Sequence, residues 1–218
     1  MERGKDRYSM GTNIVTAKVT IKGTRPLFWH WFGPEAMPID AGRKEKTGKA
    51  GNDPEEWRKS VTVTKDGQLY MPGTYAFATI REGSKYTKKG RGSIQPSVIA
   101  TLQVLDDRIL VDRYMPEFPN GHSYDISKAA PPPQDPEQPI FLDVRMVRNP
   151  ATKGANVRYR VAASPGWSCS FTIQWDKSIV SRGEMEASII DAGKLSGIGN
   201  GRKIGMGRFA VESFDVQD

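Results

Sequence analysis

Apolar and polar residues alternate most clearly near the start of the chain, from Asn13 to Gly23. Alternation with β-branched residues is typical of a half-buried strand, so this segment is predicted to be the first strand. The next stretch, RPLFWHWFG, is apolar and aromatic at successive positions. It therefore predicts either a buried strand or a hydrophobic arm.

Turn signals divide the following region into a hairpin and a helix. SVTVTKDGQLYMP places Asp66-Gly67 between two short alternating segments, which predicts a hairpin. GTYAFATIREGSKY spaces its apolar residues as a helix does, and Thr74 is the expected N-cap. VIATLQVLDDRILVD fits either a helix or strands, and its RILVD part is typical of an edge strand.

The C-terminal half alternates strands with one clear helix. IFLDVRMVRNP and NVRYRVAASPGWSCSFTIQWD are predicted to form strands, and GRFAVESFDV is predicted to be the last strand. Between them, Ser181 is a candidate cap for a helix whose apolar stripe consists of Met185, Ile189, Ile190 and Leu195.

This order of elements predicts an α+β fold, a ferredoxin-like (RRM-like) antiparallel sheet with helices on one face and inserted loops. We expect a single domain over residues 1–218, with an inserted region at about 84–140. Residues 40–56 carry charge and glycine without apolar periodicity, which predicts a flexible loop. Residues 129–139 are rich in proline and predict a surface excursion.

The charge balance suits a polyanionic partner but does not require one. Lys and Arg total 32 against 25 Asp and Glu, which gives a net charge of +7. The one cysteine, Cys169, lies in an alternating segment and is predicted to be a buried, inert thiol in a reducing compartment. The sequence holds no run of about 18 apolar residues, so we expect a cytoplasmic protein that does not contact a membrane.

Three basic groups are candidate nucleic-acid contacts, and each also has a plain structural explanation. GIGNGRKIGMG, residues 197–207, follows a predicted helix and precedes a strand, so it is not a dinucleotide-binding turn. It is either a phosphate-binding loop or a tight basic connection. Its cations are Arg202, Lys203 and Arg208. The second group is either a phosphate-tracking strip or a solvated loop, and it consists of Lys85, Tyr86, Lys88, Lys89 and Arg91. The third group, Arg158 and Arg160, shares one face of a strand, which either lines a groove or faces solvent.

Few residues are candidates for catalysis. His30 lies among aromatic residues, where a packed histidine is expected more often than a general base, and Asp40 falls in the loop after the first strand. Neither a Ser-His-Asp arrangement nor a metal-binding motif is legible, so no cofactor and no metal are expected.

Two motifs carry a resemblance to a known family. Two Gly-hydrophobic-Gly triplets around a basic spacer, at 197–207, resemble the glycine-rich loop of the RAMP superfamily of CRISPR-associated proteins. LYMPGTYAFATIR, at 69–81, is similar to the segment that leads into the first helix of CRISPR effector backbone subunits, although Ala76 to Thr79 lack the Lys/Arg-Gly pair usual there. The chain also resembles backbone-like proteins of phages and other mobile elements.

The resemblance implies a non-catalytic protein that oligomerises along single-stranded nucleic acid, RNA in preference to DNA, as a filament or ring, with other effector subunits as possible partners. The aromatic arm is the expected interface between copies; its residues are Phe28, Trp29, Trp31 and Phe32. Two alternatives stay open. One is a RAMP-type endoribonuclease that uses His30 or Asp40, and Asp40 falls in the zone where type III-like subunits carry an RNA-cleaving aspartate. The other is an assembly protein of a mobile element.

Overall fold

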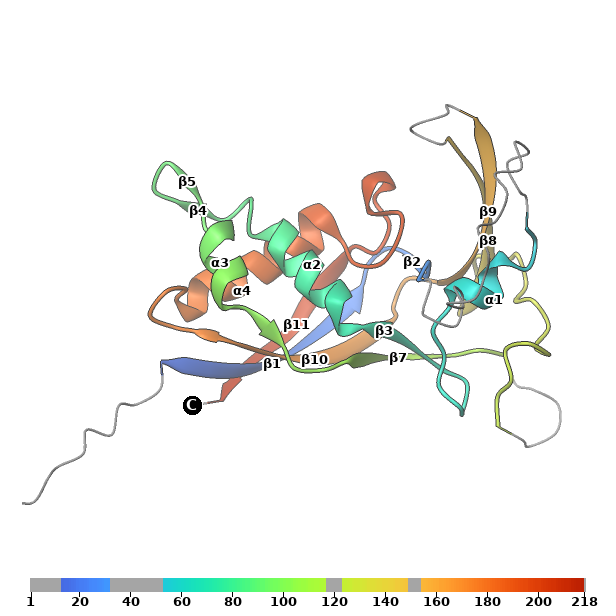
Figure 1. The fold of residues 1–218 in the computed structure, drawn as a ribbon, viewed down its shortest axis with the longest axis horizontal. Coiled ribbons are helices and arrows are strands. Elements are labelled where there is room, and N and C mark those ends of the chain that lie inside the picture. The colour runs from blue at the N-terminus through green and yellow to red at the C-terminus, as the bar shows by residue number, and fades with distance from the viewer. Residues whose placement is uncertain (1–12, 32–52, 117–122, 149–153, 218) are drawn as a thin grey trace, which may run out of the picture.

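The computed structural model describes residues 13–31, 53–116, 123–148 and 154–217. Its main sheet is antiparallel, in the order β11-β1-β10-β7-β3, with the short strand β6 beside β10 (Figure 1). The strands are β1 (Ile14–Gly23), β3 (Gln68–Pro72), β6 (Gln103–Val104), β7 (Arg108–Tyr114), β10 (Ser168–Asp176) and β11 (Phe209–Gln217).

Three helices cover one face of this sheet: α2 (Gly73–Gly83), α3 (Gln95–Thr101) and α4 (Arg182–Asp191) (Figure 1). Alternation explains the two faces, because in β1 the side chains of Ala17, Val19 and Ile21 are buried whereas Lys18 and Lys22 are exposed. The chain runs β1-α2-β7-β10-α4-β11, which is the βαββαβ order of the ferredoxin-like fold. The predicted α+β class with helices on one face is confirmed.

A second, three-stranded sheet stands beside the first, in the order β2-β9-β8. It consists of β2 (Leu27–Phe28), β8 (Ile140–Arg148) and β9 (Ala155–Ala163), with the short helix α1 (Glu56–Ser60) next to β9 (Figure 1). One cluster of buried apolar side chains joins both sheets, for example Leu27 and Val161 with Val19 and Phe171. The small sheet is therefore anchored in the main core.

The predicted inserted region of residues 84–140 contains a strand of the main sheet, and its bounds stay a prediction. β7, which lies inside that segment, pairs with both β10 and β3 in the main sheet, so it is not an edge strand either. The sequence of β7 resembles that of an edge strand because apolar residues also stand on its exposed face. Leu110 and Tyr114 point to the face of the sheet without helices. The part added to the ferredoxin-like core includes the β8–β9 hairpin.

The helices begin and end partly as predicted. Ser181 and Glu184 form a capping box at the start of α4, as the sequence indicates. Thr74 is not the cap of α2, because Pro72 takes that place and the N–H of Gly73 donates to the carbonyl of Asp107. Leu195 leaves the buried stripe of α4, because the helix widens into a π-helical turn over Ala192–Ser196 that leaves Leu195 exposed.

Two smaller predictions are confirmed. Gly67, at φ 83°, closes the turn that brings Val63 opposite Leu69, as expected for the Asp66-Gly67 hairpin. Cys169 is buried in β10, and burial raises the pKa of its thiol, which keeps it protonated and inert.

Candidate nucleic-acid interface

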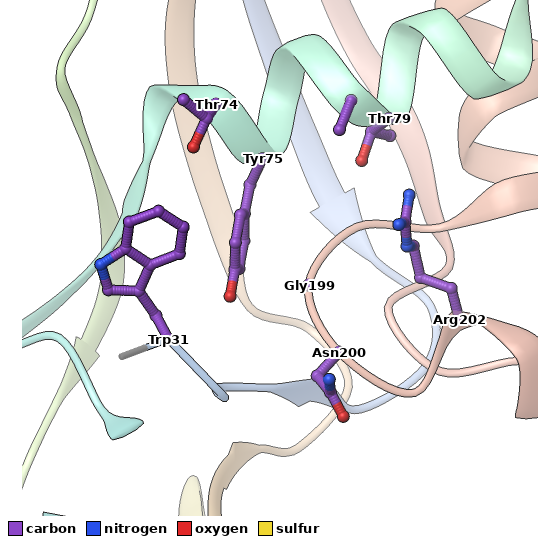
Figure 2. Close-up of a pocket in the computed structure, with 8 residues that line it drawn as sticks. Trp31, Thr74, Tyr75, Thr79, Gly199, Asn200 and Arg202 are labelled. Carbon is purple, nitrogen blue, oxygen red and sulfur yellow. The ribbon is translucent and has the colours of Figure 1, made fainter. Parts of the chain in front are cut away.

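A groove of about 370 Å³ lies between the first turns of α2 and the glycine-rich loop at residues 197–207 (Figure 2). Figure 2 shows Trp31 at one end, Arg202 at the other, and Tyr75 between them. The complete lining is Trp31, Thr74, Tyr75, Ala78, Thr79, Gly199, Asn200 and Arg202. The groove thus combines aromatic rings, hydrogen-bonding groups and one cation.

Trp31 and Tyr75 form the aromatic end of the groove. Their ring centroids lie 5.8 Å apart at an angle of 78°, an edge-to-face contact that holds both rings in place. The backbone N–H of Trp31 donates to the carbonyl of Ser60 at 2.8 Å, and its side chain remains 36% exposed. Burial raises the pKa of Tyr75 to about 12, although the charge of Arg202 opposes the shift. The Tyr75 hydroxyl therefore keeps its proton at neutral pH.

Arg202 supplies the charge of the groove. It begins the short 3₁₀ turn Arg202–Ile204 of the glycine-rich loop, and within the described residues it forms no ion pair with a carboxylate. Lys203 follows it on the exposed side of the turn and does not line the groove. Arg208 is partly buried and does not line the groove either, so only one of the three predicted loop cations reaches this site.

The glycines of this loop allow close approach to the chain itself. Gly199 has φ +80°, and a Cβ there would lie 2.6 Å from Leu27 Cδ1 and 2.9 Å from the carbonyl oxygen of Phe28. At Gly207, with φ +68°, a Cβ would lie 1.8 Å from the carbonyl oxygen of Ile198. The N–H groups of Asn200 and Gly207 donate to the carbonyls of Phe28 and Pro26 at 2.9 and 2.7 Å. The spacing of these two glycines therefore fits the loop onto β2.

Side chains anchor the loop on two further sides. The hydroxyl of Thr79 in α2 donates to the carbonyl of Gly197 at 3.2 Å. From the small sheet, Arg160 Nη1 donates to Asn200 Oδ1 at 2.6 Å. Because the oxygen of the Asn200 amide is occupied in this way, its NH₂ group is the donor left for a ligand.

Arg160 belongs to this anchor and not to a surface for nucleic acid. It is only 4% exposed and pairs with the buried carboxylate of Asp143 at 3.0 Å, while Arg145 pairs with the same carboxylate at 2.5 Å. Both guanidinium groups also lie over the ring of Phe28, at 5.0 and 5.2 Å from its centroid. The side chain of Arg160 is therefore enclosed in this conformation, and its predicted contact with nucleic acid stays a prediction.

Arg158 shares the strand β9 with Arg160 and is also ion-paired, in this case with Glu56 at the start of α1. Glu56 accepts the N–H of Tyr159 at 3.1 Å, and His30 Nε2 lies 3.5 Å from its carboxylate. Residues 53–56 of the predicted flexible loop 40–56 are thus structured, and residues 40–52 lie outside the described residues.

His30 is mostly enclosed in this cluster. Burial lowers the pKa of its imidazole; Glu56 opposes the shift, whereas Arg158 adds to it. The ring is therefore uncharged at neutral pH, and it does not line the groove. This geometry is that of the packed histidine expected from the sequence. The other candidate catalytic residue, Asp40, lies outside the described residues.

The aromatic arm has mostly turned inward. Phe28 and Trp29 are buried within their own chain, and Trp29 Nε1 donates to the carbonyl of Tyr70 at 2.8 Å. The glycine-rich loop and the small sheet cover Phe28, whereas Trp29 lies in the main core. Both side chains are enclosed in this structure, and their part in an interface between copies stays a prediction. Trp31 keeps an exposed face, and Phe32 lies outside the described residues.

The basic tract at 84–93 forms a hairpin at the far end of α2, with strands β4 (Lys88–Lys89) and β5 (Gly92–Ser93) (Figure 1). Two of its four cations are engaged: Lys85 pairs with Glu82 at 2.6 Å, and Lys89 pairs with Glu184 at 3.5 Å. In the described part of the chain, Lys88 and Arg91 have no carboxylate partner. Tyr86 is exposed beside them.

The glycine-rich loop that the sequence indicates lines the groove, but most of the other lining residues were not predicted as site residues. These are Tyr75, Thr74, Thr79 and Asn200, and Trp31 was predicted to lie in an interface instead. Tyr75 had a usable signal, because it occupies the first turn of a helix that follows Pro72-Gly73. The meeting of α2 with residues 197–207 depends on tertiary packing, which no local pattern contains.

Within the described ranges, no helix is long and apolar enough to span a membrane, and no group of three His, Cys, Asp or Glu side chains is placed to hold a metal ion. No protein-family model matches the sequence, and no curated protein matches it.

A search of solved structures finds a likeness to a chain of the type III-B Cmr-beta complex bound to cognate target RNA, determined by cryo-EM. The likeness covers 93% of this chain and 60% of that chain, with a TM-score of 0.45 and 10% sequence identity. The present chain thus spans about 60% of the length of that neighbour.

Proposed function

We propose that this chain binds single-stranded nucleic acid, RNA in preference to DNA, in the groove between α2 and the glycine-rich loop. It does so as a RAMP-type backbone protein, with several copies along one strand. The observation that carries the proposal is the order of groups in the groove: an exposed Trp31, a Tyr75 locked against it, and an Arg202 without a carboxylate partner in the described residues (Figure 2).

These groups match the parts of a nucleotide. A base stacked on Trp31 or Tyr75 gains about 1–3 kcal/mol per base, and the phosphate beside it is attracted by Arg202. The groove volume of about 370 Å³ falls at the lower end of the range of about 300–1,000 Å³ typical of small-ligand pockets. It therefore suits one nucleotide of an unpaired strand and not a duplex.

The preference for RNA follows from the polar groups of the lining. The hydroxyl of Thr74 and the NH₂ group of Asn200 are hydrogen-bonding groups within the groove. The ribose 2′-OH both donates and accepts, and it is the group that lets a protein distinguish RNA from DNA. Thr74→Val retains the shape of the side chain but removes its hydroxyl. It should therefore reduce the difference in affinity between an RNA strand and a DNA strand.

Fluorescence anisotropy with a labelled, uniform-sequence RNA strand tests the proposal. Arg202→Ala should weaken binding several-fold and reduce the slope of log K against log salt by about one, because one phosphate contact is lost. Lys203→Ala removes the same charge one residue further on, outside the groove, and serves as the matched control. Trp31→Ala should weaken binding by about 1–3 kcal/mol. Tyr114→Ala, which removes an exposed ring on the other face of the sheet, should leave binding unchanged.

Equal effects of Arg202→Ala and Lys203→Ala would show that the loop contributes only general charge. Full binding by Trp31→Ala would remove the groove from the proposal. Melting temperatures measured on each variant separate loss of binding from loss of folding.

A further inference from the structure

A second pocket, of about 300 Å³, shares Trp31 with the groove. Trp31 and Phe77 give it apolar walls, and two carboxylate residues, Asp106 and Asp107, stand at the turn between β6 and β7. The remaining lining consists of Pro72, Gly73, Thr74 and Val104. We call this the Trp31–Asp107 pocket.

The two carboxylates have different surroundings. Asp106 Oδ2 accepts the N–H of Thr172 at 2.5 Å and is thereby fixed in place. Asp107 is exposed, and among the described residues no Lys, Arg or His lies within ion-pair distance of it. Within the described ranges, the pocket therefore lacks a cation paired with Asp107. Phosphate groups are repelled from it, whereas a cation on an aliphatic stem gains both the carboxylate and the ring of Trp31.

The chain carries such cations at the other end of α2. Lys88 and Arg91 stand on the tip of the β4–β5 hairpin, and both are exposed without a carboxylate partner in the described residues. The base of the hairpin is fixed, because the N–H of Ile94 donates to the carbonyl of Thr87 at 3.0 Å and Thr87 Oγ1 donates to Asp191 at 3.0 Å. Nothing lies within 4 Å of the Cβ position at Gly90. The tip is thus a preorganised, uncovered projection.

We infer that the Trp31–Asp107 pocket receives the β4–β5 hairpin of a second copy of this chain, with Lys88 and Arg91 beside Asp107 and the ring of Trp31. The pocket adjoins the start of α2 at Gly73, and the hairpin follows the end of α2 at Gly83. The 11 residues of α2 hold the two surfaces about 16 Å apart, so the hairpin of one chain does not reach the pocket of the same chain.

Because the two surfaces differ, the contact is head-to-tail, and it leaves one pocket and one hairpin open at the ends of every pair. Contacts of this type continue into filaments or close into rings. This inference does not depend on nucleic acid: the repulsive carboxylates keep a strand out of the pocket, and the contact is testable in its absence. It also gives Trp31 two separate partners, a nucleotide in the groove and the hairpin in the Trp31–Asp107 pocket.

Cysteine crosslinking in nucleic-acid-free protein tests the contact even where the association is weak. Leu105→Cys places an exposed thiol between the pocket residues Val104 and Asp106. Gly92→Cys places one on the hairpin, where a Cβ meets no atom closer than 3.9 Å. The native Cys169 is buried and does not compete. Mixing the two variants with a short bis-maleimide should give a covalent dimer. Glu186→Cys on the exposed side of α4 replaces Leu105→Cys in the control, which should give at least about tenfold less dimer because it has no docking site.

Charge variants identify the recognition. Asp107→Lys, added to Leu105→Cys, should reduce the dimer at least about tenfold, because like charges meet. Adding Lys88→Glu and Arg91→Glu to Gly92→Cys should restore it with the Asp107→Lys partner. Glu186→Lys makes the same charge change elsewhere and should have no effect.

Equal dimer yields from Leu105→Cys and Glu186→Cys would overturn the inference, since the reagent would then report random collision. So would a yield that does not respond to Asp107→Lys. A third result, in which Lys88→Glu with Arg91→Glu weakens RNA binding while no specific dimer forms, would assign the hairpin to the strand instead and leave the groove proposal intact.

Discussion

Gly199 lines the groove, has a positive φ and packs closely against β2, so its replacement by alanine tests all three features. An alanine at φ +80° costs roughly 1–2 kcal/mol, because Cβ crowds the following carbonyl oxygen. In addition, its Cβ would lie 2.6 Å from Leu27 Cδ1 and 2.9 Å from the carbonyl oxygen of Phe28. Overpacking of this kind costs about 1–3 kcal/mol, so Gly199→Ala should lose about 2–5 kcal/mol in the free energy of unfolding.

Two other glycines separate these contributions. Gly205 has the same φ of +80° but nothing within 4 Å of its Cβ position, so Gly205→Ala should lose only the conformational part, about 1–2 kcal/mol. Gly183 lies in α4 with open space around it, and Gly183→Ala should stabilise the protein by about 0.5–1 kcal/mol.

Urea unfolding followed by tryptophan fluorescence measures the three free energies, and RNA binding by the same variants measures the effect on the groove. Gly199→Ala should weaken binding, because relief of the clash moves the loop that carries Asn200 and Arg202. Equal losses of unfolding free energy in Gly199→Ala and Gly205→Ala would show that close packing against Leu27 and Phe28 is not the reason for a glycine at position 199.

Three further predictions concern the anchors around the groove. Asp143→Ala should cost about 3–5 kcal/mol in unfolding free energy, because it leaves Arg160 enclosed without a counter-charge, whereas Asp125→Ala on an exposed turn should cost much less. Because the pKa of His30 is lowered in the folded state, the unfolded state binds the proton first as the pH falls. The unfolding free energy of the wild type should therefore decrease from pH 7.5 to 5.5 more than that of His30→Gln. Parallel pH profiles of the two proteins would exclude this linkage. Ser181→Ala should lose about 1 kcal/mol in thermal unfolding because the capping box of α4 is broken, and an unchanged melting temperature would contradict that role.

The elements that the sequence predicted well are those in which local pattern and burial agree. β1 alternates strictly and is buried on one face, and α4 has its capping box followed by Met185 and Ile189 on the core side. β7 was ambiguous for a physical reason: Leu110 and Tyr114 occupy the open face of the sheet, so its pattern lacks clean alternation.

The site was less predictable, because charge on a strand does not reveal whether a partner lies opposite. From the sequence, Arg160 is predicted to be a surface cation. In the structure, the register of β8 and β9 places Asp143 opposite Arg160. Likewise, the sequence predicts that Phe28 and Trp29 belong to an exposed arm, but the glycine-rich loop packs on Phe28 and Trp29 lies in the main core. Both outcomes follow from contacts between segments more than 15 residues apart, which local patterns do not specify.

Photocrosslinking locates a bound nucleotide directly and so shows whether it lies in the groove. An RNA strand that carries 4-thiouridine is irradiated with the full chain, and the crosslinked residues are located by mass spectrometry. Crosslinks are expected at Trp31 and Tyr75, and they should be lost on Arg202→Ala but not on Lys203→Ala. Crosslinks confined to Tyr86 on the hairpin or to Tyr114 on the open face of the sheet, with none at Trp31 or Tyr75, would show that the strand does not bind in the groove.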